Sequence, residues 1–445
     1  MNWSGDWEDT MKQPIPAAMA ATAPAAGSRR GEGAAPLVLL VVTLFFAWGF
    51  ATVLIDSLIP KLKGLFSLSY AEVMLTQFCF FLAYFVISIP AGLLLARIGY
   101  IKGIIVGLAV MALGALMFSP AAYLGVYPLF LAALFVMASG ITMLQVAANP
   151  LIAMLGRPER SHSRLTLAQA FNSLATFVGP LVGAAVILKS GVTTVDPATM
   201  SAEALEAYRR TEALHIQLPF LWIAAGALVV AAVFWGLRRS PAAPSAAGAG
   251  TSLSSLKLFA RPRLGLGALS MFLYVGAEVS VGSLMVSYLM QATTLHAAAA
   301  DASRLVAFYW GGAMIGRFIG SVVLRYSPAG LALAGCALMA ALLAVVSAGS
   351  LGLAAAVAVI AIGLFNSIMF PTIFTLAIED LGEETPQGSG ILCLAIVGGA
   401  VVPLLSGAVA DAAGLARALY VPAACYLAIA FYGLAAWKGL RGARA

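Results

Sequence analysis

Charged residues are scarce in this sequence. Only 10% of its 445 residues are Asp, Glu, Lys or Arg, whereas 62% are hydrophobic. A soluble domain carries roughly 25% charged residues, because water must solvate its surface. The composition, with a mean hydropathy of +0.98, therefore excludes a chain that faces only water. The apolar stretches last about 20 residues or more, the length that an α-helix needs to cross a bilayer.

Cysteine, histidine and catalytic motifs are scarce as well. The four cysteines lie inside apolar stretches at unrelated spacings, which predicts small buried side chains rather than disulfides or metal ligands. The three histidines form no ligand pattern, and no Gly-x-x-x-x-Gly-Lys-Ser/Thr motif is present to bind ATP. We therefore expect no catalytic residue, no metal and no cofactor. A membrane enzyme or receptor would need a catalytic constellation or a soluble domain that the sequence lacks.

The basic residues are unevenly distributed. The net charge is +7, and most Lys and Arg fall in short segments on one side of the predicted spans. This bias holds loops in the cytoplasm, so it explains the charge without a nucleic-acid partner. It predicts a multi-pass membrane protein with both termini in the cytoplasm.

The apolar stretches form two sets of six. The predicted units are residues 1–35, a disordered cytoplasmic tail; 36–238, a six-helix bundle; 239–262, a cytoplasmic linker; 263–438, a second six-helix bundle; and 439–445, a cytoplasmic tail. The largest external loop is expected between Ser190 and Ile216. The twelve spans are expected to begin near Leu37, Tyr70, Ile101, Tyr127, Arg164, Gln217, Leu264, Ser303, Pro328, Leu351, Gln387 and Ala416.

The two sets repeat each other at an offset of about 225 residues. Four matches keep the same order along the chain: Trp48 with Tyr274, Arg97 with Arg325, Gln145 with Asn366, and Pro180 with Pro403. Each match is weak, but four in order are not chance. Six spans followed by six in the same orientation form the parallel repeat of major facilitator transporters.

Five motifs are specific enough to indicate a family: Asp56-Ser-Leu-Ile-Pro60, Gln145-Val-Ala-Ala-Asn149-Pro150, Leu167-Ala-Gln169-Ala-Phe-Asn172-Ser173, Tyr274-Val-Gly-Ala-Glu278-Val-Ser280 and Asn366-Ser-Ile-Met-Phe-Pro371-Thr372. They resemble the fucose–galactose–proton symporter family, and within it the bacterial glucose/galactose transporter branch. The resemblance covers nearly the whole chain, from about Leu37 to Trp437.

The resemblance implies an all-α membrane protein with twelve transmembrane helices in two six-helix bundles, the major facilitator fold. It implies uptake of glucose or galactose by proton symport through alternating access, in a bacterial inner membrane. Sodium coupling, or uptake of another sugar such as fucose or an amino sugar, is the alternative. An exporter of drugs or sugars would share the fold, but exporters tend to have more apolar cavities, with fewer amide side chains than this sequence offers. Nothing in the sequence suggests more than a monomer.

One position departs from the fucose permease pattern. That pattern has a glutamate where this chain has Gln145, and the glutamate is implicated in proton coupling with an aspartate on the first helix. Here only Asp56 remains of the pair. The change favours the glucose/galactose branch, which resembles this chain in carrying glutamine there, and leaves the coupling mechanism open.

Two acids inside predicted spans are candidates for the coupled proton. A carboxylate at the centre of a span costs at least about 2.5–3.5 kcal/mol, so it normally faces a cavity or a partner. Asp56 lies towards the outer end of the first span, where it could instead be an interfacial acid beside Lys61 and Lys63. Glu278 lies within the seventh span and could instead be a packing acid held by hydrogen bonds.

A set of amides is the candidate sugar site. Amides offer donors and acceptors without charge, which suits the hydroxyl groups of a neutral sugar. The alternative is ordinary hydrogen bonding between helices. The set consists of Gln145, Asn149, Gln169, Asn172 and Asn366.

Aromatic and basic residues complete the prediction. Trp48 and Tyr274 are the candidate stacking rings, because the repeat pairs them, although packing against neighbours is as good an explanation for either ring alone. Arg97 and Arg325 resemble the cytoplasmic gate of the superfamily.

A further arginine lies inside the eighth span. Arg317 needs a carboxylate or carbonyl partner; the sequence does not name one, and Glu379 and Asp380 at the end of the tenth span are two possibilities.

Overall fold

The computed structural model describes residues 34–66, 70–186, 202–238 and 253–438. Side chains are described within these ranges except at 34–35, 53–66, 70–75, 77, 180–186, 202–216, 253–256 and 299–300. The predicted terminal tails lie outside the described residues, apart from the backbone of residues 34 and 35, and so does most of the predicted linker. The side chain of Asp56 also lies outside them.

The first half of the chain forms six helices, because long apolar stretches alternate with short polar turns. Gly99 and Gly125 flank one of these helices with positive φ angles, 82° and 62°, which glycine adopts without strain. The helices are α1 (Ala34–Phe66), α2 (Tyr70–Ile98), α3 (Tyr100–Leu124), α4 (Tyr127–Met154), α5 (Ser161–Val186) and α6 (Ala202–Gly236), with a 3₁₀ turn η2 (Pro158–Arg160) before α5.

The second half repeats this pattern with more interruptions. The elements are η4 (Leu253–Ala260), α7 (Pro262–Leu289), α8 (Ala299–Val323), α9 (Ala329–Gly349), α10 (Gly352–Asn366), α11 (Met369–Ile378), η5 (Gly382–Glu384), α12 (Thr385–Leu394), η6 (Ala395–Val397), α13 (Gly398–Ala413), α14 (Leu415–Ala418) and α15 (Tyr420–Lys438). We count α10 with α11, α12 with α13, and α14 with α15 as one span each.

The described helices then form the twelve expected spans. Ten described stretches are long and apolar enough to cross a membrane, and α1 contributes a shorter apolar helix, Pro36–Thr52. The remaining span is α5, which carries several polar side chains. Eleven starts lie within about four residues of the prediction. The helix α6 begins earlier, at Ala202, because Ala, Glu and Leu in this segment are strong helix formers, whereas its apolar stretch begins at Gln217, as predicted.

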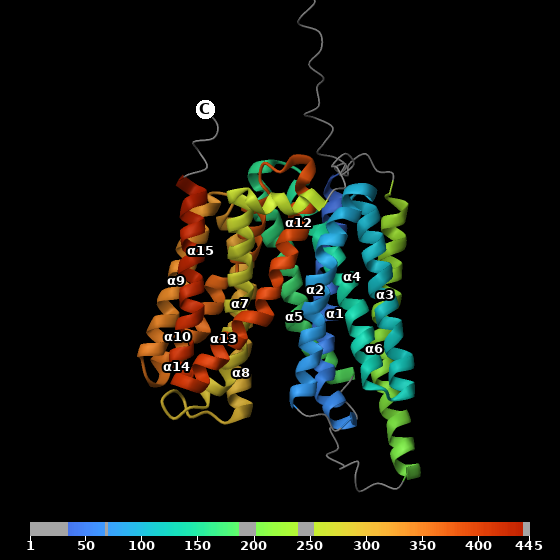
Figure 1. Cartoon of the computed structure of the whole chain (residues 1–445). Helices are drawn as coiled ribbons and strands as arrows, with labels where there is room; N and C mark the ends of the chain where they lie inside the picture. The colour runs from blue at the N-terminus through green and yellow to red at the C-terminus, as the bar shows by residue number, and fades with distance from the viewer. Residues whose placement is uncertain (1–33, 67–69, 187–201, 239–252, 439–445) are drawn as a thin grey trace, which may run out of the picture.

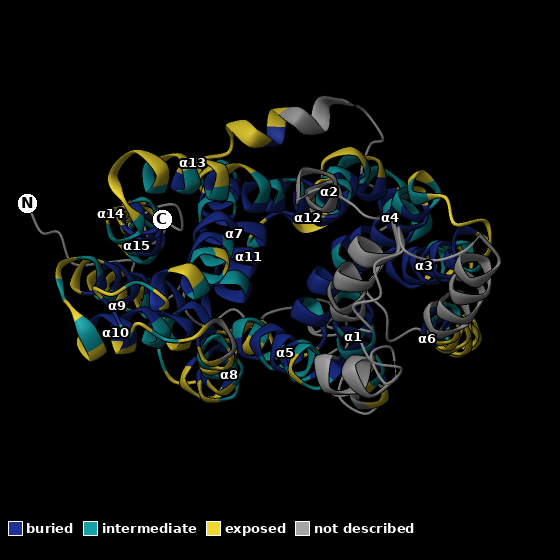
Figure 2. Cartoon of the chain, turned by 90° about the horizontal axis from the view of Figure 1, so that it is seen from below, coloured by how far each residue is buried: buried dark blue, intermediate teal, exposed yellow. Residues whose placement is uncertain are grey.

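The helices are arranged in two groups. Helices α1–α6 lie on one side and α7–α15 on the other (Figure 1). Viewed along the helices, α2 meets α12 on one flank and α5 meets α8 on the opposite flank (Figure 2). The repeat relates α2 to α8 and α5 to α12, so the two contacts are counterparts. We call the end where α1 begins and α15 ends, at the top of Figure 1, the terminal end.

The contact between α2 and α12 depends on glycine. A Cβ atom on Gly390 would lie 2.7 Å from the carbonyl oxygen of Ser88, and one on Gly92 would lie 2.8 Å from that of Pro386. Both distances are shorter than side chains tolerate. The absence of a side chain therefore lets two backbones from different halves touch, as small residues do at membrane helix interfaces.

We predict that Gly390→Val lowers thermal stability. The added side chain must separate α2 from α12, at a cost of about 1–3 kcal/mol for overpacking. The measurement is the unfolding temperature of the purified protein in detergent. Gly335→Val on α9 is the matched control, because nothing lies within 4 Å of a Cβ atom there. Equal shifts for the two variants would contradict this account of the interface.

Candidate functional site

A buried carboxylate and a buried guanidinium lie together in the second half. The side chains of Glu278 on α7 and Arg317 on α8 are 14% and 12% exposed, and Oε1 of Glu278 lies 3.9 Å from Nη2 of Arg317. The hydroxyl of Tyr274, one turn before Glu278, donates to the same Oε1 at 2.7 Å. Removing one partner of such a pair is costly, because it leaves an uncompensated buried charge.

Arg317 also reaches the first half of the chain. Its Nη1 donates to the hydroxyl of Ser173 and lies 3.5 Å from the carbonyl oxygen of Gln169, both on α5. Its Nε donates to the carbonyl oxygen of Ser367 at 3.2 Å. The guanidinium therefore joins two halves that are otherwise connected by helix packing and a few polar contacts.

The two acids considered as possible partners of Arg317 do not pair with it, whereas a carbonyl partner, the other possibility, is found in Ser367. Glu379 and Asp380 pair with Arg263 at the start of α7 instead. They follow α11 at the terminal end, whereas Arg317 lies deeper in α8 beside Glu278. The sequence could not distinguish these acids, because it does not fix how far along α8 the guanidinium reaches.

Two prolines explain why certain carbonyl groups accept these bonds. Proline has no N–H, so the carbonyl four residues earlier loses its helical donor. Pro371 frees the carbonyl of Ser367, which accepts from Arg317. Pro150 frees the carbonyl of Val146, which accepts from the hydroxyl of Ser389 in the other half at 2.8 Å. The two prolines therefore supply one acceptor to Arg317 and one to the contact between the halves.

Each half holds an amide against a tyrosine hydroxyl. Gln145 Nε2 donates to the hydroxyl of Tyr84 at 2.5 Å, and Asn366 Nδ2 donates to that of Tyr309 at 2.9 Å. In both cases the amide is on the fourth span of its half and the tyrosine on the second. The hydroxyl of Tyr309 in turn donates to the backbone carbonyl of Glu278 at 3.3 Å. The tyrosines are site residues that the sequence analysis missed; they lie 225 residues apart, so the offset of the repeat was the available signal.

The remaining amides lie on α4 and α5. Gln169 Nε2 lies 3.4 Å from Oδ1 of Asn149, and Nδ2 of Asn172 donates to the carbonyl oxygen of Phe45 at 3.0 Å. The structure thus brings Asn149 and Gln169 together. It links them through Arg317 to Glu278, whereas Asn172 faces α1.

Three buried side-chain amide atoms have no hydrogen-bond partner among the described residues. They are Nδ2 of Asn149, a donor, and two acceptors, Oδ1 of Asn366 and Oε1 of Gln387. Buried polar groups are otherwise almost always paired with protein or water. Asn149 therefore has a donor free for a ligand or for water.

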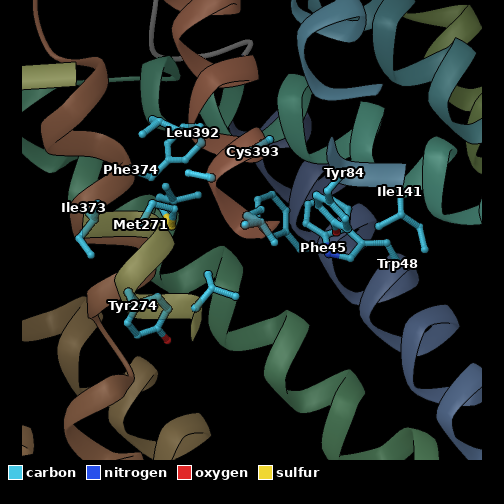
Figure 3. Close-up of a cluster of buried hydrophobic side chains, with 14 of the residues drawn as sticks. Phe45, Trp48, Tyr84, Ile141, Met271, Tyr274, Ile373, Phe374, Leu392 and Cys393 are labelled. Carbon is cyan, nitrogen blue, oxygen red and sulfur yellow. The ribbon is translucent and has the colours of Figure 1, made fainter. Parts of the chain in front are cut away.

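The two predicted stacking rings lie in different halves. Trp48 is 3% exposed and its ring centroid lies 4.2 Å from that of Phe45. Tyr274 is fully buried. Figure 3 shows Trp48 beside Tyr84 and Tyr274 well away from both. Protein side chains cover both rings in this structure, so sugar stacking stays a prediction.

A second polar cluster joins the halves at the terminal end. Nδ1 of His162 on α5 lies 2.5 Å from the hydroxyl of Thr375 on α11, and its Nε2 lies 3.3 Å from Oε1 of Glu379. The hydroxyl of Ser163 donates to the carbonyl oxygen of Ser321 at 2.5 Å. A cavity of about 480 Å³ lies beside this cluster and is lined by α4, η2, α5 and α11 residues.

The predicted gate arginines differ in their contacts. Nε of Arg325 lies 3.3 Å from the hydroxyl of Ser163 in the other half. Arg97 is exposed at the end of α2, and no hydrogen bond or ion pair links it to another described side chain.

The sequence analysis missed His162, whose position at the start of a polar span was the available signal.

Comparisons with known proteins agree with this architecture. A sequence profile of the Major Facilitator Superfamily matches residues 37–396. The chain is 51% identical to the glucose/galactose transporter of Brucella abortus over 391 residues, 88% of this chain and 92% of that protein. It is 37% identical to the L-fucose-proton symporter of Escherichia coli over 405 residues, 88% and 90% of the two chains.

A solved structure is similar over nearly its whole length. The crystal structure of a Major Facilitator Superfamily transporter, FucP, in the outward conformation aligns with a TM-score of 0.84 and 34% identity. The alignment covers 91% of this chain and 99% of that one.

We predict that Tyr309→Phe destabilises the second half. The change removes the acceptor of the Asn366 amide, and a buried donor without a partner costs about 1–3 kcal/mol. Thermal unfolding in detergent measures the loss. Tyr326→Phe is the control, because Tyr326 is 84% exposed. If both variants unfold at the wild-type temperature, the hydroxyl of Tyr309 does not hold the amide.

Proposed function

Because the chain belongs to the Major Facilitator Superfamily and, within it, to the fucose–galactose–proton symporter family, we propose that it takes up a hexose together with protons. It is a multi-pass membrane transporter and not an enzyme. Glucose and galactose are the proposed sugars, since the relative at 51% identity is named for both.

The observation that carries the proposal is the polar chain between the halves. It runs from Asn149 through Gln169 and Arg317 to Glu278. Amides supply uncharged donors and acceptors for sugar hydroxyls, and Asn149 retains an unpaired donor. We propose that Gln145, Asn172, Tyr274, Asn366 and Trp48 belong to the same sugar site in other states of the transport cycle.

Asp56 and Glu278 are the proposed proton carriers. Glu278 is buried beside the guanidinium of Arg317. Protonation of its carboxylate would remove the negative charge of this ion pair and so change the electrostatic energy of the site. Asp56 is proposed from the family motif alone. A sodium ion in place of the proton is the competing form of the proposal, and the uptake experiment below separates the two.

Alternating access is the proposed mechanism. The polar contacts between the halves at the terminal end are those of His162, Ser163 and Arg325. We propose that this end is cytoplasmic and that the structure corresponds to a state closed towards the cytoplasm. Opening would break these contacts, with Arg97 as a further gate residue. We also propose a monomer in a bacterial inner membrane.

We predict proton-driven accumulation of galactose or glucose. Cells that lack their own hexose carriers should accumulate labelled sugar through this protein and lose the accumulation when a protonophore is added. A potential of 100 mV supplies about 2.3 kcal/mol per proton, enough for about 50-fold accumulation. Replacing external sodium should have no effect. Uptake that ignores the protonophore but needs sodium would contradict the proton coupling.

We predict that Asp56→Asn and Glu278→Gln abolish accumulation. A neutral side chain cannot carry the coupled proton, so labelled sugar should at most equilibrate across the membrane. Asp411→Asn and Glu383→Gln are matched controls at exposed positions. Accumulation at wild-type levels in Glu278→Gln would remove Glu278 from the coupling mechanism and leave Asp56 alone.

We predict that the terminal end is cytoplasmic. A green fluorescent protein fused after Lys438 should fluoresce, whereas alkaline phosphatase at the same point should be inactive, because its disulfides form only outside the cytoplasm. Fusions after Gln291, between α7 and α8, should behave in the opposite way. The reverse pattern at both points would invert the proposed orientation.

A further inference from the structure

We propose that Arg317 is a positioning residue that couples the charge of Glu278 to contact between the two halves. The inference rests on the proposed function, in which Glu278 binds the coupled proton. It adds a physical route from that proton to the movement of the halves.

The geometry places Arg317 between two sets of acceptors. Its own half offers the carboxylate of Glu278, 3.9 Å away, and the carbonyl of Ser367 at 3.2 Å. The other half offers the hydroxyl of Ser173 and the carbonyl of Gln169. A guanidinium has five N–H donors in a rigid fork, so it can serve both sets, although only one set carries charge.

The charge of Glu278 determines which set is stronger. An ionised carboxylate attracts the guanidinium to its own half, because charge-assisted hydrogen bonds are roughly twice as strong as neutral ones. When Glu278 is protonated, the remaining acceptors are neutral, and two of them are on α5. Protonation should therefore shift Arg317 towards α5 and strengthen the contact between α5 and α8.

Other groups around Glu278 do not supply this link. The titratable or charged side chains that face it are Tyr274 on its own helix, Tyr309 and Arg317 on α8, and Tyr426 on α15. Among these four side chains, Arg317 is the one whose recorded hydrogen bonds cross to the first half. Tyr274 donates to the carboxylate within the second half, and Tyr309 donates to the backbone carbonyl of the same residue.

A consequence follows for the terminal end. Helices α5 and α8 also meet there, where the hydroxyl of Ser163 donates to the carbonyl of Ser321. A stronger bond between Arg317 and Ser173 favours the state in which this end is closed. Protons at Glu278 should thus favour closure of the terminal end even without sugar.

The experiment measures the distance between spin labels on the two halves. Labels are attached through Arg157→Cys and Glu383→Cys, two exposed positions at the terminal end, after the four native cysteines are replaced with alanine. Double electron–electron resonance on the purified full-length protein gives the ratio of closed to open molecules at pH 5 and pH 8. It requires neither a known sugar nor uptake.

We expect the closed state to be more populated at pH 5 than at pH 8 in the otherwise unchanged protein. Glu278→Gln should be closed at both pH values, because glutamine imitates the protonated acid. Ser173→Ala should lower the closed-to-open ratio by about tenfold or more at pH 5, as the loss of one charge-assisted hydrogen bond predicts. Ser280→Ala is the matched control, because that hydroxyl bonds only the carbonyl of Gly276 on its own helix.

Three outcomes would overturn the inference. One is a distance distribution that does not change with pH. Another is equal behaviour of Ser173→Ala and Ser280→Ala. The third is a pH response that persists in Glu278→Gln, which would assign the titration to another group such as His162 beside Glu379. A failed sugar uptake with the expected distances would instead refute the proposed hexose and leave the role of Arg317 intact.

Discussion

Every buried polar group in a bundle surrounded by lipid must find its partners inside the protein, because the hydrocarbon offers none. The contacts of Arg317 illustrate this constraint. Its side chain is 12% exposed, and its guanidinium takes its partners from α5, α7 and the segment between α10 and α11. A single side chain therefore holds together helices from both halves. Its position also determines where Glu278 finds a positive partner.

The internal repeat explains why the halves meet as they do. Equivalent prolines free equivalent carbonyl groups, but the two halves use them differently. The carbonyl of Val146 accepts a hydroxyl from the opposite half, whereas that of Ser367 accepts Arg317 from its own half. Likewise each half pairs an amide with a tyrosine, yet among the side chains that the structure describes a carboxylate lies beside such a pair only in the second half. The two halves thus share a scaffold, and among the described residues the buried pair of carboxylate and guanidinium lies in the second half.

Much of this was predictable from the sequence. Hydropathy located the spans because lipid demands long apolar stretches, but it did not show that α6 extends back to Ala202, because a polar helix has no such signature. The family motifs located Asn149, Gln169 and Glu278, and the structure joins them. The partner of Arg317 stayed open in the sequence, and Tyr84, Tyr309 and His162 were missed. Their contacts depend on the rotation of helices about their axes, which the sequence leaves open.

The central claim is that a sugar and a proton share one site at the contact between the halves, with Glu278 as a proton carrier. Calorimetry of galactose binding to the purified protein, repeated in buffers of different ionisation enthalpy, counts the protons taken up with the sugar. The account predicts net proton uptake by the wild type and less uptake by Glu278→Gln. The same proton count for both proteins would contradict it.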